Sequence, residues 1–318
     1  MVSDITKEFL GQKLPYMTNP QKKYLEKIQI PLDGYRNRVQ EELKNLERPK
    51  ASWTLTDLIA SGAQFPSTFM GKTTYIDPDN TFLVGYKAFQ NLRSAYRFMA
   101  EHAQNALNDT VFCKECLYLT AYCLKCLCGW PLVDKNRVTK DGVSLAQMST
   151  FLNAVIADAP EDFIAELGNR LMMPERNWDK ITTARGKATV FLATGRFEEA
   201  YQHAEQLQMI ADRRKKPVYF WRHYAQGIKA IIDHDEEFLN IILPDLVSRY
   251  RVGPPEVPYM MAYPALGLAK LAAQNGLQVT IDTMDCPQAL IQPTQMDYSH
   301  LELPKPKYGF PWEKRNER

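Results

Sequence analysis

Apolar residues recur at intervals of three and four along most of this 318-residue chain, and this spacing limits the folds that it can form. Such i, i+3, i+4, i+7 patterns are typical of amphipathic helices, whereas the alternating patterns of strands are scarce and short here. We therefore predict an all-α fold. With 45% apolar and 24% charged residues, the chain has an ordinary globular composition and is long enough to bury a large core.

The second half of the chain carries the most regular helical pattern. Helices are expected over residues 143–157, 160–171, 178–194, 196–213, 216–232, 235–250 and 258–275. The connectors between them have the short lengths found between antiparallel helices. This pattern predicts an irregular stack of antiparallel helical hairpins.

One stretch of this half, "ATVFLATGRFEEAYQHAEQL" at 188–207, resembles a tetratricopeptide unit. It contains a helix, a turn at Gly195 and the start of a second helix, and alanines along both helices allow them to approach closely. No second copy follows at the constant period of about 34 residues that such arrays show. The C-terminal half is therefore predicted to be TPR-like, with irregular repeats.

The polar segment "VDKNRVTKDG", at 133–142, is rich in turn-forming residues and is the best candidate for a boundary. It separates an N-terminal helical region (1–132), with a long helix over about 81–107, from the TPR-like region (133–286). A proline-rich tail (287–318) is expected to wrap the surface or to be partly mobile. A single continuous helical domain would give much the same pattern.

Three short segments predict local structure. Asn108 and Asp109 are expected to cap a helix that follows them. "LQVTID", after Gly276, could form a single short strand. "DHDEE", at 233–237, superficially resembles a metal site, but its carboxylates stand where an N-cap and first-turn acids belong, so a helix start is the favoured interpretation.

"FCKECLYLTAYCLKC", residues 112–126, places four cysteines in a C-x2-C-x6-C-x2-C pattern that raises the question of a zinc site. The residues between the two pairs include neither glycine nor proline and continue the helical pattern. On one ideal helix Cys113 and Cys126 lie about 20 Å apart, so a single ion cannot bind both.

On the same helix Cys116 and Cys123 fall on one apolar stripe, whereas Lys114 and Lys125 point to another side. Free cysteine behaves as a small apolar residue, so we predict that these thiols are packed in the core. Zinc binding or redox chemistry at the cysteines is the alternative interpretation.

Charge and motifs exclude several classes of function. The formal net charge of +2 lacks the excess that phosphate binding usually requires, so nucleic acid is not a favoured partner. No stretch has the roughly 20 consecutive apolar residues of a spanning helix, and no export signal is visible, so a cytoplasmic protein without a membrane partner is expected. Phosphate-binding, hydrolase and zinc-protease motifs are missing from the sequence, so we predict neither enzymatic activity nor a cofactor.

A dense basic and aromatic cluster, "RRKKPVYFWRHY", spans residues 213–224. Arginine, tyrosine and tryptophan are enriched where interfaces gain most of their energy, so the cluster is a candidate partner-binding patch. The alternative is that the basic residues complement a helix C-terminus and the aromatic residues are partly core. Together with the aromatic residues of the tail, the candidate contacts are Arg214, Tyr219, Trp221, Arg222, Tyr298, Tyr308 and Trp312.

The segment "MMAYPALGLAKLAAQNGLQVTIDTMDCPQALI", at 260–291, is similar to the ending of the Imm49 immunity protein family of bacterial polymorphic toxin systems. The shared features are an alanine-rich helix, the turn "NGL" at 275–277, a short extended piece, and Pro287 before apolar residues. The long helix at 81–107 and the later hairpins are compatible with the same helical family. The resemblance lies mainly in the C-terminal half and does not include the cysteine cluster.

This resemblance implies a non-enzymatic cytoplasmic antitoxin that binds a cognate secreted toxin and blocks its active site. A rigid stack of hairpins with a few aromatic or arginine contacts is compatible with that role. The alternatives are a TPR-like adaptor or chaperone that binds a peptide segment of a partner, and an enzyme or metal sensor that uses the cysteines.

Overall fold

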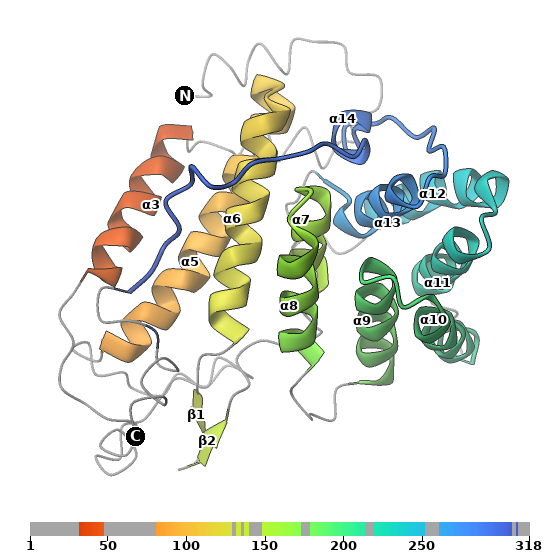
Figure 1. The fold of residues 1–318 in the computed structure, drawn as a ribbon, viewed down its shortest axis with the longest axis horizontal. Helices are drawn as coiled ribbons and strands as arrows, with labels where there is room; N and C mark the ends of the chain where they lie inside the picture. The colour runs from red at the N-terminus through yellow and green to blue at the C-terminus, as the bar shows by residue number, and fades with distance from the viewer. Residues whose placement is uncertain are drawn as a thin grey trace.

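The computed structural model describes residues 32–47, 81–128, 132–134, 137–139, 148–172, 179–213, 219–251, 261–306 and 310. Within these residues the fold is all-α apart from one two-stranded hairpin (Figure 1). The predicted fold class is therefore confirmed. None of the helices in this part of the chain combines the length and apolar character needed to cross a bilayer.

Three long helices form one end of the molecule: α3 (Leu32–Leu46), α5 (Thr81–His102) and α6 (Thr110–Cys128). The middle helix, α5, packs against both of the others. A single π-turn, η1 (Ala103–Leu107), extends α5 to the end that the sequence predicted.

The predicted cap of α6 is confirmed at its second residue. Asn108 has the left-handed φ of 51° and closes η1. Asp109 then accepts a hydrogen bond from the Phe112 amide at 2.9 Å. This bond satisfies one of the free amides in the first turn of α6.

The polar segment after α6 contains a small hairpin that the sequence pattern did not predict. Strand β1 (Leu132–Asp134) pairs antiparallel with β2 (Arg137–Thr139), so that Val133 lies opposite Val138. Strands of three residues are too short to show an alternating pattern.

Two short helices, α7 (Met148–Ile156) and α8 (Glu161–Met172), occupy the middle of the molecule between the long helices and the remaining stack (Figure 1). α7 contacts α6 on one side and the C-terminal helix α13 (Tyr263–Gln274) on another. Its residues are buried almost all round, which explains why its sequence is so apolar.

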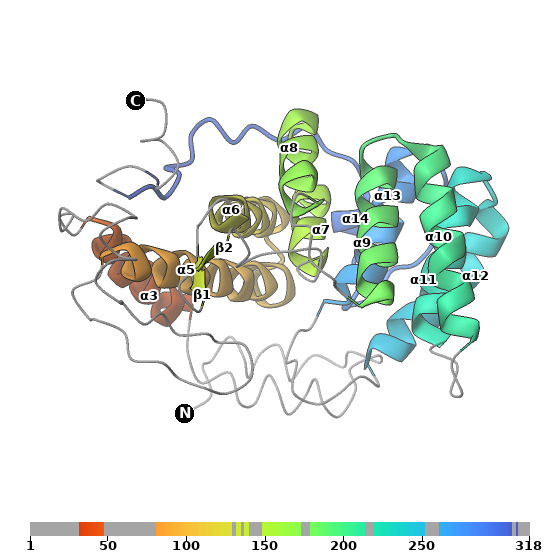
Figure 2. The same cartoon turned by 90° about the horizontal axis from the view of Figure 1, so that it is seen from below.

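The predicted hairpins form the other end of the molecule. Helices α9 (Lys180–Ala193), α10 (Phe197–Asp212), α11 (Tyr219–Ile232) and α12 (Glu236–Arg251) each pack against the next, and their bounds agree with the predicted ranges to within a few residues (Figure 2). This confirms a stack of consecutively packed helices. The TPR-like character of the C-terminal half, with irregular repeats, stays a prediction.

The ends of these helices use the predicted residues. Gly195 has a φ of 72°, and the next amide, that of Arg196, donates to the carbonyl oxygen of Phe191 at 2.8 Å. Asp235 caps α12 by accepting from the Phe238 amide at 3.0 Å. The "DHDEE" segment is thus the start of a helix, as predicted.

The chain then returns to the middle of the molecule. α13 packs against α7 at Gly267, where an added Cβ would lie 2.6–2.9 Å from side-chain carbons of Leu152. Glycine at this position therefore allows the two helices to approach closely. At the start of α13, the Tyr263 hydroxyl donates to Glu101 of α5 at 3.0 Å, and the Arg97 guanidinium lies 4.0 Å from the centre of the Tyr263 ring.

The strand predicted after Gly276 does not form. Residues 277–282 form neither helix nor strand, and side chains of α12 supply their partners. The amide of Thr280 donates to Asn240 at 2.9 Å, and Asn240 donates to the carbonyl oxygen of Gln278 at 2.8 Å. Because a helix side chain satisfies both backbone groups, this segment needs no neighbouring strand.

After the short helix α14 (Gln288–Ile291), residues 292–306 form an extended segment that we call the strap. It crosses α6 and runs toward the α3–α5 end of the molecule (Figure 1). Within it the Tyr298 ring stacks on Tyr118 of α6 at 4.0 Å between centroids, and Phe310 beyond it contacts Phe89 of α5. The expectation that the tail wraps the surface is confirmed for this part.

Candidate functional site

The structure brings some of the predicted contact residues together at the start of α11. Tyr219 begins the helix, and Trp221 and Arg222 lie in its first turn. Arg214, Tyr308 and Trp312 lie outside the described residues. We call residues 220–223 the α11 ridge.

Packing fixes the indole ring of Trp221 on this ridge. The Arg185 guanidinium of α9 lies over the ring, 4.5 Å from its centre. The rings of Phe220 and Tyr224 meet it edge-on, with centroids 4.6 and 6.2 Å away. Because Trp221 remains half-buried and is already ordered, a partner could contact it at low entropic cost.

The two polar side chains of the ridge, Arg222 and His223, have acidic partners on other helices. Arg222 forms an ion pair with Asp212 at 3.5 Å, and both side chains are 41% exposed. Asp245 of α12 binds His223 and also accepts from Arg249 at 2.5 Å. Partial burial acts to raise the pKa of Asp245, but hydrogen bonds from Arg249 and His223 outweigh burial and hold it below its usual value.

The ridge therefore combines an ordered aromatic ring with one arginine, Arg222, whose side chain is partly exposed. Guanidinium groups bind carboxylates with two parallel hydrogen bonds, and the ring supplies apolar contact area. This combination is suited to a protein surface that carries acidic residues.

Tyr298, a predicted contact in the tail, is instead part of the internal packing. Its side chain is buried against Tyr118, and its hydroxyl donates to the carbonyl oxygen of Ala157. The sequence did not distinguish an exposed tail tyrosine from one that attaches the tail. We leave Tyr298 out of the α11 ridge.

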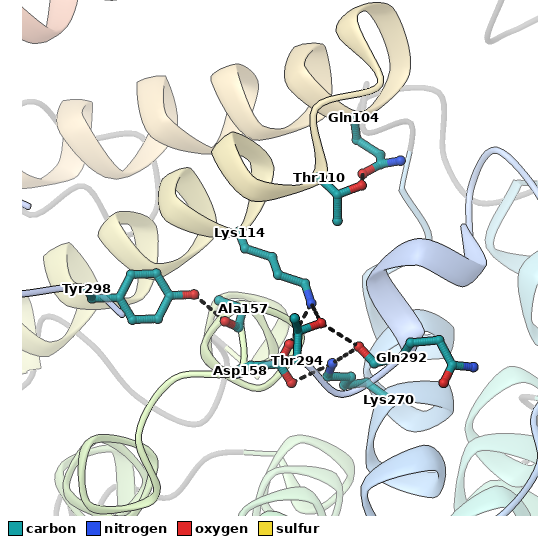
Figure 3. Close-up of polar contacts among 9 residues, drawn as sticks. All are labelled: Gln104, Thr110, Lys114, Ala157, Asp158, Lys270, Gln292, Thr294 and Tyr298. Atoms are coloured by element: carbon teal, nitrogen blue, oxygen red, sulfur yellow. Dashed lines mark hydrogen bonds and ion pairs between the residues drawn. The ribbon is translucent and has the colours of Figure 1, made fainter. Parts of the chain in front are cut away.

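Near Tyr298 lies a buried group of two lysines and one aspartate, which we call the lysine centre (Figure 3). Lys114 of α6 and Lys270 of α13 have side chains only 1% and 0% exposed, and their ammonium groups contact the two oxygens of Asp158 at 2.6 and 2.5 Å. Lys114 also donates to the Thr294 hydroxyl, and Lys270 to the carbonyl oxygen of Gln292, each at 2.8 Å.

The backbone of Asp158 shows why a carboxylate stands in this turn. The residue lies two positions after the end of α7 and has a left-handed φ of 55°, and the Ala159 amide donates to the carbonyl oxygen of Ala154 at 3.0 Å. Glycine occupies the same position after α9 and α13, at Gly195 and Gly276. An aspartate here costs backbone strain that glycine would avoid, so the interaction of its side chain offsets that cost.

The lysine centre carries two positive charges against one negative charge. Burial lowers the pKa of Lys270 to about 8, although Asp158 acts to raise it. A neutral lysine is a good nucleophile, but this amine is fully buried and bonded on two sides, which favours a structural role.

The cysteines of α6 are packed as predicted. Cys113, Cys116, Cys123 and Cys126 are buried free thiols, and Cys128 is partly exposed. Burial raises the pKa of Cys126 and of Cys128 to about 12, and it raises the pKa of Cys113 and Cys123 well above the usual range. Among the described residues, no group of three or more His, Cys, Asp or Glu side chains converges as a metal site would require.

The lysine centre is the feature that sequence reasoning missed. The charge of Lys114 predicted a polar side of its helix, and Lys270 is the only charged residue of the alanine-rich helix α13. A lone lysine inside an otherwise apolar helix was the available signal, because it needs a buried partner.

Comparison of the chain with protein-family models, with curated proteins and with solved structures found no match.

Proposed function

We propose that this protein is an immunity protein that binds a cognate bacterial toxin and covers its active site. The α11 ridge carries the proposal, because Trp221 is held in place by Arg185 and the neighbouring Arg222 is partly exposed. The similarity of residues 260–291 to the Imm49 family supports the same role.

The stack behind the ridge suits an inhibitor of this kind. Consecutive packing from α9 to α12 and the return of α13 to α7 hold the ridge on a continuous core. A surface that is ordered before binding loses little conformational entropy in the complex, which favours tight binding.

The direct test is co-expression with the protein encoded by the neighbouring gene, scored by growth of a cell that produces this toxin. We expect rescue of growth and a purified complex with a Kd of about nanomolar or lower. If neither rescue of growth nor a complex is found, the proposed function is wrong.

The ridge is tested with Trp221→Ala and Arg222→Glu. Truncating a central aromatic contact is expected to raise the Kd about thirtyfold or more. Arg196→Glu is the matched control, because Arg196 is also a half-exposed arginine in an ion pair, with Glu199 at 2.6 Å, and belongs to the turn before α10. Equal effects of the two charge reversals would show that the ridge is not the contact surface.

The consecutive hairpins also favour a second candidate, an adaptor that binds a peptide segment of its partner. The same purification distinguishes the two functions. An antitoxin retains one folded toxin domain, whereas an adaptor retains a short segment and binds it more weakly.

A further inference from the structure

The strap is attached to the helices through side chains. Lys270 donates to the carbonyl oxygen of Gln292 and Lys114 donates to the Thr294 hydroxyl, each at 2.8 Å. The Tyr298 hydroxyl donates to Ala157, and His300 contacts Glu115 of α6 at 3.0 Å. Met296 and Leu301 also pack against the core, but an extended segment separates from a fold at lower cost than a fully packed helix does.

The strap covers the lysine centre while remaining at the surface itself. Residues 292–295 are exposed, yet the two ammonium groups beneath them are almost completely buried (Figure 3). Of the oxygens in the described residues that bind these ammonium groups, only those of Asp158 are charged; the strap contributes a carbonyl and a hydroxyl.

Charge therefore favours release of the strap, whereas packing favours its retention. A second positive charge without its own carboxylate is costly in a buried site, and water would solvate it if the strap moved away. Stacking of Tyr298 on Tyr118 and the hydrogen bonds to Gln292 and Thr294 act in the opposite direction.

We propose that the strap is a lid with two states, which opens over the lysine centre while the helices stay folded. In the open state Lys114, Lys270 and the ring of Tyr118 become accessible to solvent and to an anionic partner. The neutral oxygens of Gln292 and Thr294 set the balance, because they are the strap groups that the lysines bind.

Hydrogen–deuterium exchange of the full chain at neutral pH tests this proposal. The Leu301 amide reports on the strap, because it donates to the carbonyl oxygen of Tyr298 at 3.1 Å, and it is expected to exchange at least about tenfold faster than the amides of α13, since local opening needs less free energy than unfolding. Thr294→Val removes an acceptor of a charged donor and should increase exchange of the strap by a further factor of about ten.

Thr294→Asp should have the opposite effect, because it places a carboxylate where the hydroxyl binds Lys114 and balances the charge. Gln295→Asp is the control, since it adds the same charge at the next, exposed position of the strap. We expect Thr294→Asp alone to slow exchange of the Leu301 amide about tenfold or more.

Three results would overturn the proposal. In the first, the unmodified strap exchanges at the same rate as α13, which means that it opens only when the protein unfolds. In the second, Thr294→Val leaves exchange unchanged. In the third, Thr294→Asp and Gln295→Asp change it equally, which means that the position opposite Lys114 has no special role.

Discussion

At the scale of single residues, Asp158 joins a backbone requirement to an electrostatic one. Its left-handed turn would accept glycine more easily, and its carboxylate lies between two buried lysines. Neither property follows from the local sequence "IADAPED", in which Asp158 looks like an ordinary exposed turn residue. By contrast, the caps at Asp109 and Asp235 were predictable because their partners lie three residues away.

We predict that Asp158→Gly lowers the free energy of unfolding by about 3 kcal/mol or more, because two buried ammonium groups lose the carboxylate that they share. Lys270→Met, which leaves one lysine with one carboxylate, should lower the free energy of unfolding by less than Asp158→Gly does. Urea unfolding of the two variants measures both effects. If the relief of backbone strain outweighed the loss of the two ion pairs, Asp158→Gly would be more stable than the unmodified protein.

At the scale of elements, the helices were predictable and the side chains that face their neighbours were only partly so. Periodicity located α10 to α12 most directly, because each of these helices buries one stripe. It was less informative for α6, which is buried on several sides, so that Lys114 lies in the core together with the cysteines. At the α11 ridge, Trp221 and Arg222 are neighbours in the sequence, but Arg185, which lies over the Trp221 ring, comes from another helix.

The α6 thiols should make the fold sensitive to alkali. Burial raises their pKa in the folded state, whereas in the unfolded chain they titrate near the ordinary value of 9.0. Above about pH 9 the unfolded chain therefore loses protons that the fold retains, and stability falls by up to about 1.4 kcal/mol per pH unit for each thiol.

Urea unfolding across this pH range measures that loss of stability. Cys126→Ala should reduce the slope of the free energy of unfolding against pH by the contribution of one thiol. Thiolate absorbance should appear only together with unfolding. A native protein that shows thiolate absorbance near pH 9 would contradict the burial of these side chains.

At the scale of the whole molecule, α13 and the strap connect the two halves that the sequence separated at 133–142. α13 packs on α7, its Tyr263 binds Glu101 of α5, and the strap lies on α6. Local patterns locate helices but carry no information on which of them meet across the chain, so this return could not be predicted. One domain and two domains were therefore equally compatible with the sequence.

We predict a single cooperative thermal transition for the full chain, with equal calorimetric and van't Hoff enthalpies. Tyr263→Phe, which removes one hydroxyl between the halves, should lower the Tm without dividing the transition. Two separate transitions in the unmodified protein would show that the halves are independent folding units.

The return of the carboxyl-terminal segment to the first helices limits the gain or loss of helical repeats during evolution. Open solenoids gain or lose repeats at their ends, since each unit touches only its neighbours. Here α13 and the strap span the distance back to α7, α6 and α5, so an inserted hairpin would have to be matched by a longer span. The contacts of α13 and the strap with these earlier helices therefore fix the number of helical units that lie between them.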